Sequence, residues 1–209
     1  MKCLITVSFV CLSGLLPMIA IGQDMRFTDS AGITKENHPV DFTEWNDPKY
    51  LIANSANDVD YLTLAEKKVY YYLNLVRLNP KLFAATYLSY LKTATDYYQR
   101  SLYRELQRMK PLPIFKPNRK LFESARCHAI ESGISGYTGH HRMKCKEYFM
   151  GECCHYGRSD ALEIVTSLLI DNGVSSLGHR KICLGNYTEL GVSIQPHKTF
   201  GENTVLDFE

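Results

Sequence analysis

The sequence predicts an α+β fold in which helices surround a small, mainly antiparallel sheet. Apolar residues recur at helical spacing over much of residues 60–133 and again over residues 160–173. Segments that alternate as strands do are short, and they lie in the second half of the chain. Helices therefore come both before and after the strands, an order that favours helices packed around a small sheet. A chain of 209 residues is long enough to bury one full core.

The first helix has the clearest boundaries. Thr63 and Glu66 stand at the positions of a capping box, and Asn79-Pro80 should end or kink the helix. Asp160 is expected to cap a second amphipathic helix, which Gly173 stops. The other helical patterns run over residues 81–91, 96–109 and 117–133, with a short helical turn from residue 179, and the strands over residues 148–156, 187–195 and 204–208.

The N-terminus has the form of a secretory signal peptide, residues 1–22. A lysine precedes an apolar stretch, and Ala20 and Gly22 are small residues before a cut at Gln23. A retained membrane anchor is the alternative, against which Pro17 and the cleavage site argue. We interpret residues 23–59 as a polar arm lying on the domain and held by Trp45, and residues 60–209 as the domain itself. The mature chain is then exported, to a periplasmic or extracellular space, without a transmembrane segment.

Five cysteines remain after the signal peptide. An exported chain meets an oxidising compartment, so disulfides are expected before a cysteine zinc cluster, and no Cys-x-x-Cys is present. An odd number allows at most two bridges. Fifteen pairings of four of the five are possible, and the sequence leaves them open; the cysteines are Cys127, Cys145, Cys153, Cys154 and Cys183.

The net charge and the absence of several known motifs argue against nucleic-acid binding, nucleotide binding and the common hydrolase classes. The formal net charge is +2, which provides no strong field to gather nucleic acid or an anionic membrane. No phosphate loop, dinucleotide glycine motif, His-Glu-x-x-His or Gly-x-Ser-x-Gly occurs.

Three polar segments could carry chemistry, and they are centred on His140, Glu152 and His179. Two histidines and a glutamate from separate segments can form a metal site or an acid–base cluster. A Cys/His hydrolase would use Cys153 or Cys154, but the flanking residues match neither familiar cysteine-protease signature. The remaining histidines have plainer expected roles: His128 is structural on its helix, and His141 and His155 lie at the surface.

The helix YLTLAEKKVYYYLNLVRLNP resembles the opening helix of the CAP superfamily, the SCP-like domains of cysteine-rich secretory proteins, venom antigens and plant pathogenesis-related proteins. Further motifs follow in that family's order over residues 60–209. Gly139-His140 is similar to the first cavity histidine and Gly151-Glu152 to the Gly-Glu-Asn-Ile strand. Ser176-Leu177-Gly178-His179-Arg180 is similar to the Gly-His-Arg turn of the bacterial branch. In this chain Cys153-Cys154 replace the asparagine and isoleucine, and the usual tryptophan of the fourth-helix region is absent.

The resemblance implies a three-layer α/β/α sandwich with a cleft lined by His140, Glu152 and His179, able in relatives to hold zinc or another divalent metal. His141 is the alternative to His140, and Asp171 is a candidate for the family's second cavity acid. His197 is expected near the rim of the cleft. If Glu152 faces the cleft, strand alternation places the Cys154 side chain on the same face and the Cys153 side chain on the other.

Two classes of function follow from the resemblance. The first, which we favour, is a secreted non-enzymatic binding module whose cleft or groove holds a lipid, sterol, glycan or partner protein. The second is a metal-dependent hydrolase in which Glu152 acts as base toward a zinc-bound water. The family brings no settled reaction, and a fold alone cannot supply one. A zinc site that uses Glu152 as ligand also leaves no assured base.

Overall fold

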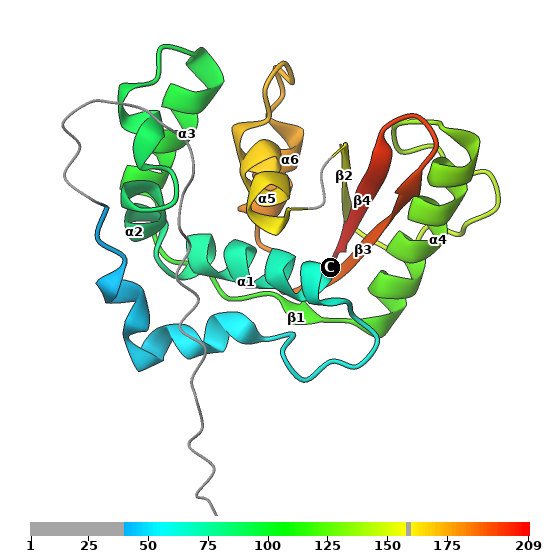
Figure 1. Ribbon diagram of the computed structural model, residues 1–209, viewed down its shortest axis with the longest axis horizontal. Helices are drawn as coiled ribbons and strands as arrows, with labels where there is room; N and C mark the ends of the chain where they lie inside the picture. The colour runs from blue at the N-terminus through cyan, green and yellow to red at the C-terminus, as the bar shows by residue number, and fades with distance from the viewer. Residues whose placement is uncertain (1–39, 158–159) are drawn as a thin grey trace, which may run out of the picture. The chain divides into compact units, whose positions relative to one another are not determined.

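The computed structural model describes residues 40–157 and 160–209, so the expected signal peptide and residues 23–39 lie outside the described residues. The fold is mixed α/β, with a four-stranded sheet in the order β1-β3-β4-β2 (Figure 1). The helices are α1 Leu64–Leu78, α2 Pro80–Ala85, α3 Tyr97–Arg108, α4 Arg119–Ser135, α5 Ala161–Ile170 and α6 Gly178–Cys183. The strands are β1 Lys116–Pro117, β2 Gly151–Tyr156, β3 Glu189–His197 and β4 Gly201–Phe208, and 3₁₀ helices cover Thr43–Asn46, Pro48–Asn54 and Ser89–Thr93.

The predicted start and end of the first helix are confirmed. The Thr63 hydroxyl accepts from the Glu66 backbone N–H at 3.3 Å, and the Glu66 carboxylate accepts from the Thr63 N–H at 2.7 Å. α1 ends at Leu78, and Asn79 caps the short helix that begins at Pro80. Asp160 caps α5 as predicted. The pattern over residues 81–91 is not one helix, because it divides between α2 and a 3₁₀ turn.

The sheet is mainly antiparallel, as expected. β4 pairs with β2 and with β3 in antiparallel fashion, while the two residues of β1 run parallel to β3. Alternation divides the side chains of β4 between two faces. Asp207 and Asn203 contact α4, whereas Leu206 and Phe208 join the main core with α1 and α5. Figure 1 shows α4 on one side of the sheet and α5 and α6 on the other side of the sheet.

Glycine 191 allows the close approach of α4 to the sheet. It lies opposite Asp207 in the β3–β4 ladder, on the face that α4 covers. A Cβ atom at this position would overlap the backbone of Leu121 and Phe122 at the start of α4. Glycine is therefore required here by space.

The last part of the expected arm is packed on the domain. Trp45 is 9% exposed, and its indole N–H donates to the Thr86 hydroxyl at 3.0 Å. Its ring lies 4.6 Å from that of Tyr50, measured between centroids. Trp45 thus holds this segment against the domain, and its contacts make residues 43–54 part of the same core.

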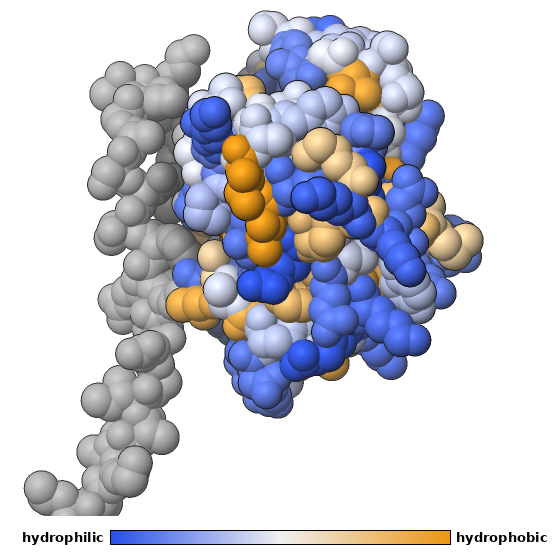
Figure 2. Space-filling model, turned by 90° about the vertical axis from the view of Figure 1, so that its right-hand side faces the viewer, coloured by the Kyte–Doolittle hydropathy of each residue, from blue (hydrophilic) through white to orange (hydrophobic). Residues whose placement is uncertain are grey.

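A disulfide between Cys127 and Cys145 joins α4 to the loop that follows it. The Glu131 carboxylate also accepts the backbone N–H groups of Met143 and Lys144, at 2.9 and 2.7 Å. The outer side of α4 (Figure 2) carries a groove of about 510 Å³ that the disulfide helps to line. These contacts attach residues 143–145, in the loop that carries His140, to α4. Within the described residues, no helix has the length and apolar character needed to cross a bilayer.

Candidate functional site

His140 and Glu152 form the first half of the candidate site. Glu152 lies on β2 beside Asp207 of β4, with its side chain 2% exposed. The His140 Nδ1–H donates to Glu152 Oε1 at 2.8 Å, and this hydrogen bond raises the pKa of His140. Burial raises the pKa of Glu152, but hydrogen bonds from His140 and Arg142 outweigh it, so that pKa is lowered. Glu152 is therefore an ionised carboxylate that orients His140.

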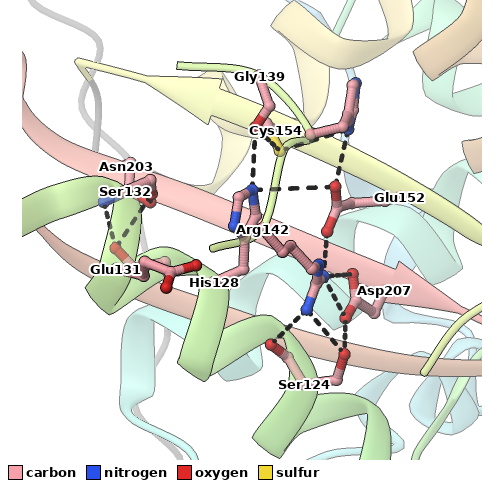
Figure 3. Close-up of polar contacts among 12 residues, drawn as sticks. Ser124, His128, Glu131, Ser132, Gly139, Arg142, Glu152, Cys154, Asn203 and Asp207 are labelled. Atoms are coloured by element: carbon pink, nitrogen blue, oxygen red, sulfur yellow. Dashed lines mark hydrogen bonds and ion pairs between the residues drawn. The ribbon is translucent and has the colours of Figure 1, made fainter. Parts of the chain in front are cut away.

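Arg142 forms ion pairs with two buried carboxylates (Figure 3). Its guanidinium donates to Glu152 Oε2 and to Asp207 Oδ2, the latter at 3.0 Å, and its side chain is 2% exposed. Ser124 on α4 completes the network, because its hydroxyl donates to Asp207 at 2.6 Å and accepts from Arg142. Burial raises the pKa of Asp207 to about 7 despite these contacts.

His179 and Asp171 form the second half of the site. The His179 Nδ1–H donates to Asp171 Oδ1 at 2.7 Å, and the backbone N–H of His179 donates to Oδ2 at 2.9 Å. Asp171 adopts a left-handed conformation with φ 56°, and it ends α5 two residues before the expected Gly173. The conformation costs energy for a non-glycine residue, and the two hydrogen bonds to His179 offset it. Asp171 is the acid that the resemblance proposed, and it orients His179 as Glu152 orients His140.

The structure brings the three predicted site residues together. The rings of His140 and His179 lie 6.3 Å apart between centroids, although their residues are far apart in sequence. A cavity of about 260 Å³ is lined by Asp171 and His179, together with Cys154 and His155. His179 is 24% exposed and His140 is 57% exposed, so both rings reach solvent.

The structure also places three other histidines whose positions were predicted from the sequence, His141, His155 and His197. His140 rather than His141 bonds to Glu152, while His141 is exposed and packs on the Tyr137 ring. His155 is 8% exposed on β2 and is not a surface residue. His197 is 3% exposed and bonds to the Tyr137 carbonyl, so it stabilises a turn and does not sit at an exposed rim.

Both histidines of the pair present a nitrogen suited to metal binding. A carboxylate accepts a hydrogen bond from each Nδ1–H, which leaves Nε2 as the ring nitrogen that could bind a metal, and no described residue bonds to either Nε2. Metal-bound histidines in proteins donate the other ring N–H to a carboxylate, a backbone carbonyl or water. Two imidazoles on one tetrahedral zinc would have centroids about 5 Å apart, for Zn–N bonds of about 2.1 Å. The observed 6.3 Å between the His140 and His179 ring centroids is larger than this by about 1 Å.

A second group of ligand atoms lies behind the histidine pair. Atoms of His128, Glu152 and Cys154 lie within 4.8 Å of one another, and this group could hold a metal ion. Cys154 lies on the same face of β2 as Glu152, near the Gly139 carbonyl. Cys153 points to the other face, toward the His179 carbonyl and Cys183. The two adjacent cysteines thus have different surroundings, as strand alternation predicts.

Sequence reasoning missed Arg142, Asp207 and the proximity of His128 to the site. Arg142 was visible beside His140, but its role depends on two carboxylates that reach it from β2 and β4. Asp207 carried a usable signal, since it is a charged residue within an apolar alternating strand. His128 is buried on α4 as expected, yet its Nε2 lies 4.0 Å from Glu152.

Comparison with known proteins adds no relative. No family model matches this chain, and a search of curated proteins found no match.

Proposed function

We propose that this chain is an exported, SCP-like binding module of the CAP superfamily type, whose cleft holds a divalent metal at His140 and His179. One observation carries the proposal: two histidine–carboxylate pairs face each other with 6.3 Å between ring centroids. The metal most suited to two imidazoles with an open position is zinc. When bound, it would supply an electrophilic centre that attracts an oxygen or nitrogen of the partner. Glu152 and Asp171 would orient its ligands without binding it.

The layered arrangement of helices and sheet supports this proposal. Side chains of β4 divide between α4 on one face and the core with α1 and α5 on the other. This arrangement agrees with the three-layer α/β/α sandwich of the SCP-like domains. The Cys127–Cys145 disulfide supports an oxidising compartment, as the signal-like residues 1–22 do.

The size of the cavity favours some ligands over others. Pockets that enclose a whole small molecule are about 300–1,000 Å³ and mostly apolar. The cavity beside His179 has about 260 Å³ and is bordered by polar groups such as Asp171 and Asn172. We therefore favour a glycan or a protein partner that inserts a polar group, over a lipid or sterol buried in full.

The contacts of Glu152 argue against the hydrolase alternative. A general base needs a free lone pair and a pKa near the working pH. The Glu152 carboxylate is bonded to Arg142 and to His140, and its pKa is lowered. A carboxylate held in this way is a poor proton acceptor, so binding is the better supported role.

Zinc titration of the purified protein by calorimetry tests the proposal. The double variant His140→Ala with His179→Ala should bind about one zinc ion fewer than wild type and lose little stability in metal-free buffer. His141→Ala is the matched control, because it removes an exposed neighbouring histidine that lies outside the pair. The proposal fails if wild type takes up no zinc, or if the double variant binds as much as wild type. Strong destabilisation of the double variant without zinc uptake by wild type would indicate a structural cluster instead.

A further inference from the structure

A buried cluster of metal-ligating atoms lies between α4 and β2, on the inner side of His140. We define the inner cluster as His128 of α4 with Glu152 and Cys154 of β2. His128 is 1% exposed and Cys154 is 8% exposed. Figure 3 shows the three side chains directed toward one another, with the Gly139 carbonyl above them. Nitrogen, oxygen and sulfur ligands thus converge at one point.

The distances place these atoms around a small space. The His128 Nε2 lies 4.0 Å from Glu152 Oε1 and donates to the Gly139 carbonyl at 2.9 Å. The Cys154 Sγ lies 3.7 Å from that carbonyl and 3.8 Å from His140 Nδ1. Zinc bonds of about 2.0–2.3 Å require ligand atoms about 3.3–3.8 Å apart in a tetrahedral site. Ligand atoms of the inner cluster, which lie within 4.8 Å of one another, would have to approach by up to about 1–1.5 Å.

We propose that His128 Nε2, Glu152 Oε1 and Cys154 Sγ bind a zinc ion as a site of their own. The proposal goes beyond the histidine pair, because neither His140 nor His179 is a ligand of this site. A mixed nitrogen, oxygen and sulfur set suits zinc and disfavours Mg²⁺ or Ca²⁺, which prefer oxygen alone. Cys154 also borders the cavity that His179 lines.

The charges of the site balance when the ion is bound. The Cys154 thiol gives up its proton to solvent, so the thiolate and the ionised carboxylates of Glu152 and Asp207 together balance the dication and the Arg142 guanidinium. No oxidation or reduction takes place. Arg142 keeps its second carboxylate, Asp207, and uses Oε2 of Glu152, which leaves Oε1 for the metal. Oε1 has two lone pairs and can retain the hydrogen bond from His140.

The imidazole of His128 can also adjust. In this structure the His128 Nε2–H donates to the Gly139 carbonyl. Binding at Nε2 requires this proton to move to Nδ1, and no described residue bonds to that buried atom. The alternative to a metal site is apolar packing of the Cys154 thiol against Ala125, Ala129 and Val205. That alternative predicts no metal at Cys154.

Cobalt titration of the purified protein distinguishes the two. Co²⁺ substitutes for zinc, and a thiolate ligand adds a strong charge-transfer absorption in the near ultraviolet. We expect this band in wild type and its displacement by Zn²⁺. Cys154→Ser should remove the band, and His128→Gln should weaken cobalt binding by at least about tenfold. Cys153→Ser is the matched control, because this buried thiol is the next residue of the strand but points to the other face.

The outcomes separate this site from the histidine pair. If His179→Ala keeps the band, the inner site stands whether or not the outer pair binds metal. Cobalt bound without a charge-transfer band, or a band retained in Cys154→Ser, would overturn the inner site. Zinc protection of Cys154 from alkylation, read by mass spectrometry on wild type, gives the same decision if a variant fails to fold. Equal labelling with and without zinc would contradict the proposal.

Discussion

Replacing Arg142 by methionine should destabilise the protein in a pH-dependent way. The side chain is 2% exposed and is the shared cation of Glu152 and Asp207, whose side chains are 2% and 0% exposed. Methionine retains most of the volume of arginine and removes the charge. Removing one partner from a buried ion pair costs about 3–5 kcal/mol. We expect a loss of this size in the free energy of unfolding near pH 8.

The sign of the pH dependence follows from the carboxylates. Without Arg142 the pKa values of Glu152 and Asp207 both rise in the folded state, while the unfolded state is unchanged. The folded variant then binds more protons than folded wild type, so its stability falls further behind as pH rises. Each extra bound proton adds about 1.4 kcal/mol of difference per pH unit. The loss should therefore be much smaller at pH 5.5 than at pH 8.

Urea unfolding at the two pH values measures this difference. Arg126→Met is the matched control, because Arg126 is an exposed arginine of α4, and it should change stability little at either pH. A loss below about 1 kcal/mol at pH 8 would refute the assigned role of Arg142. So would a loss that does not depend on pH.

Three further predictions follow from the same contacts. Burial raises the pKa of Asp207 to about 7, so wild type should lose stability as pH rises from 5 toward 7. Urea midpoints measured over this range should fall less in Asp207→Asn than in wild type. Replacing Cys127 and Cys145 by alanine removes a bridge of sequence separation 18 and should lower the free energy of unfolding by about 3 kcal/mol. Hydrogen exchange should become faster only in the loop of residues 137–150, and unchanged exchange there would contradict the role of the bridge. Gly191→Ala should cost at least about 3 kcal/mol in thermal or urea unfolding, because its Cβ would meet the backbone of α4, whereas Gly178→Ala has room and should cost little.

Local signals in the sequence predicted much of the fold. The capping box of Thr63 and Glu66 and the break at Asn79-Pro80 act over a few residues, so they can be recognised without the tertiary structure. The end of α5 could not be predicted in this way. Asp171 replaces Gly173 as the terminating residue because its carboxylate binds His179, which arrives from a later segment. A tertiary contact here overrides the usual preference for glycine.

The candidate site likewise combines residues that the sequence predicted with contacts that it did not predict. His140, Glu152 and His179 were expected to converge because their motifs resemble those of one family, and the structure places them together. The pairing of Arg142 with Asp207 depends on the register of β2 against β4, which no local pattern contains. The sequence could name His140, Glu152 and His179, whereas the ion pairs of Arg142 with Glu152 and Asp207 required the fold.

The metal content of the purified protein tests the central claim most directly. Elemental analysis of wild type and of the double variant His140→Ala with His179→Ala, both prepared without chelator, gives the number of ions per chain. Our account predicts that wild type carries zinc or another divalent metal and that the double variant carries about one ion fewer. Wild type without bound divalent metal, or equal metal content in the two proteins, would contradict it.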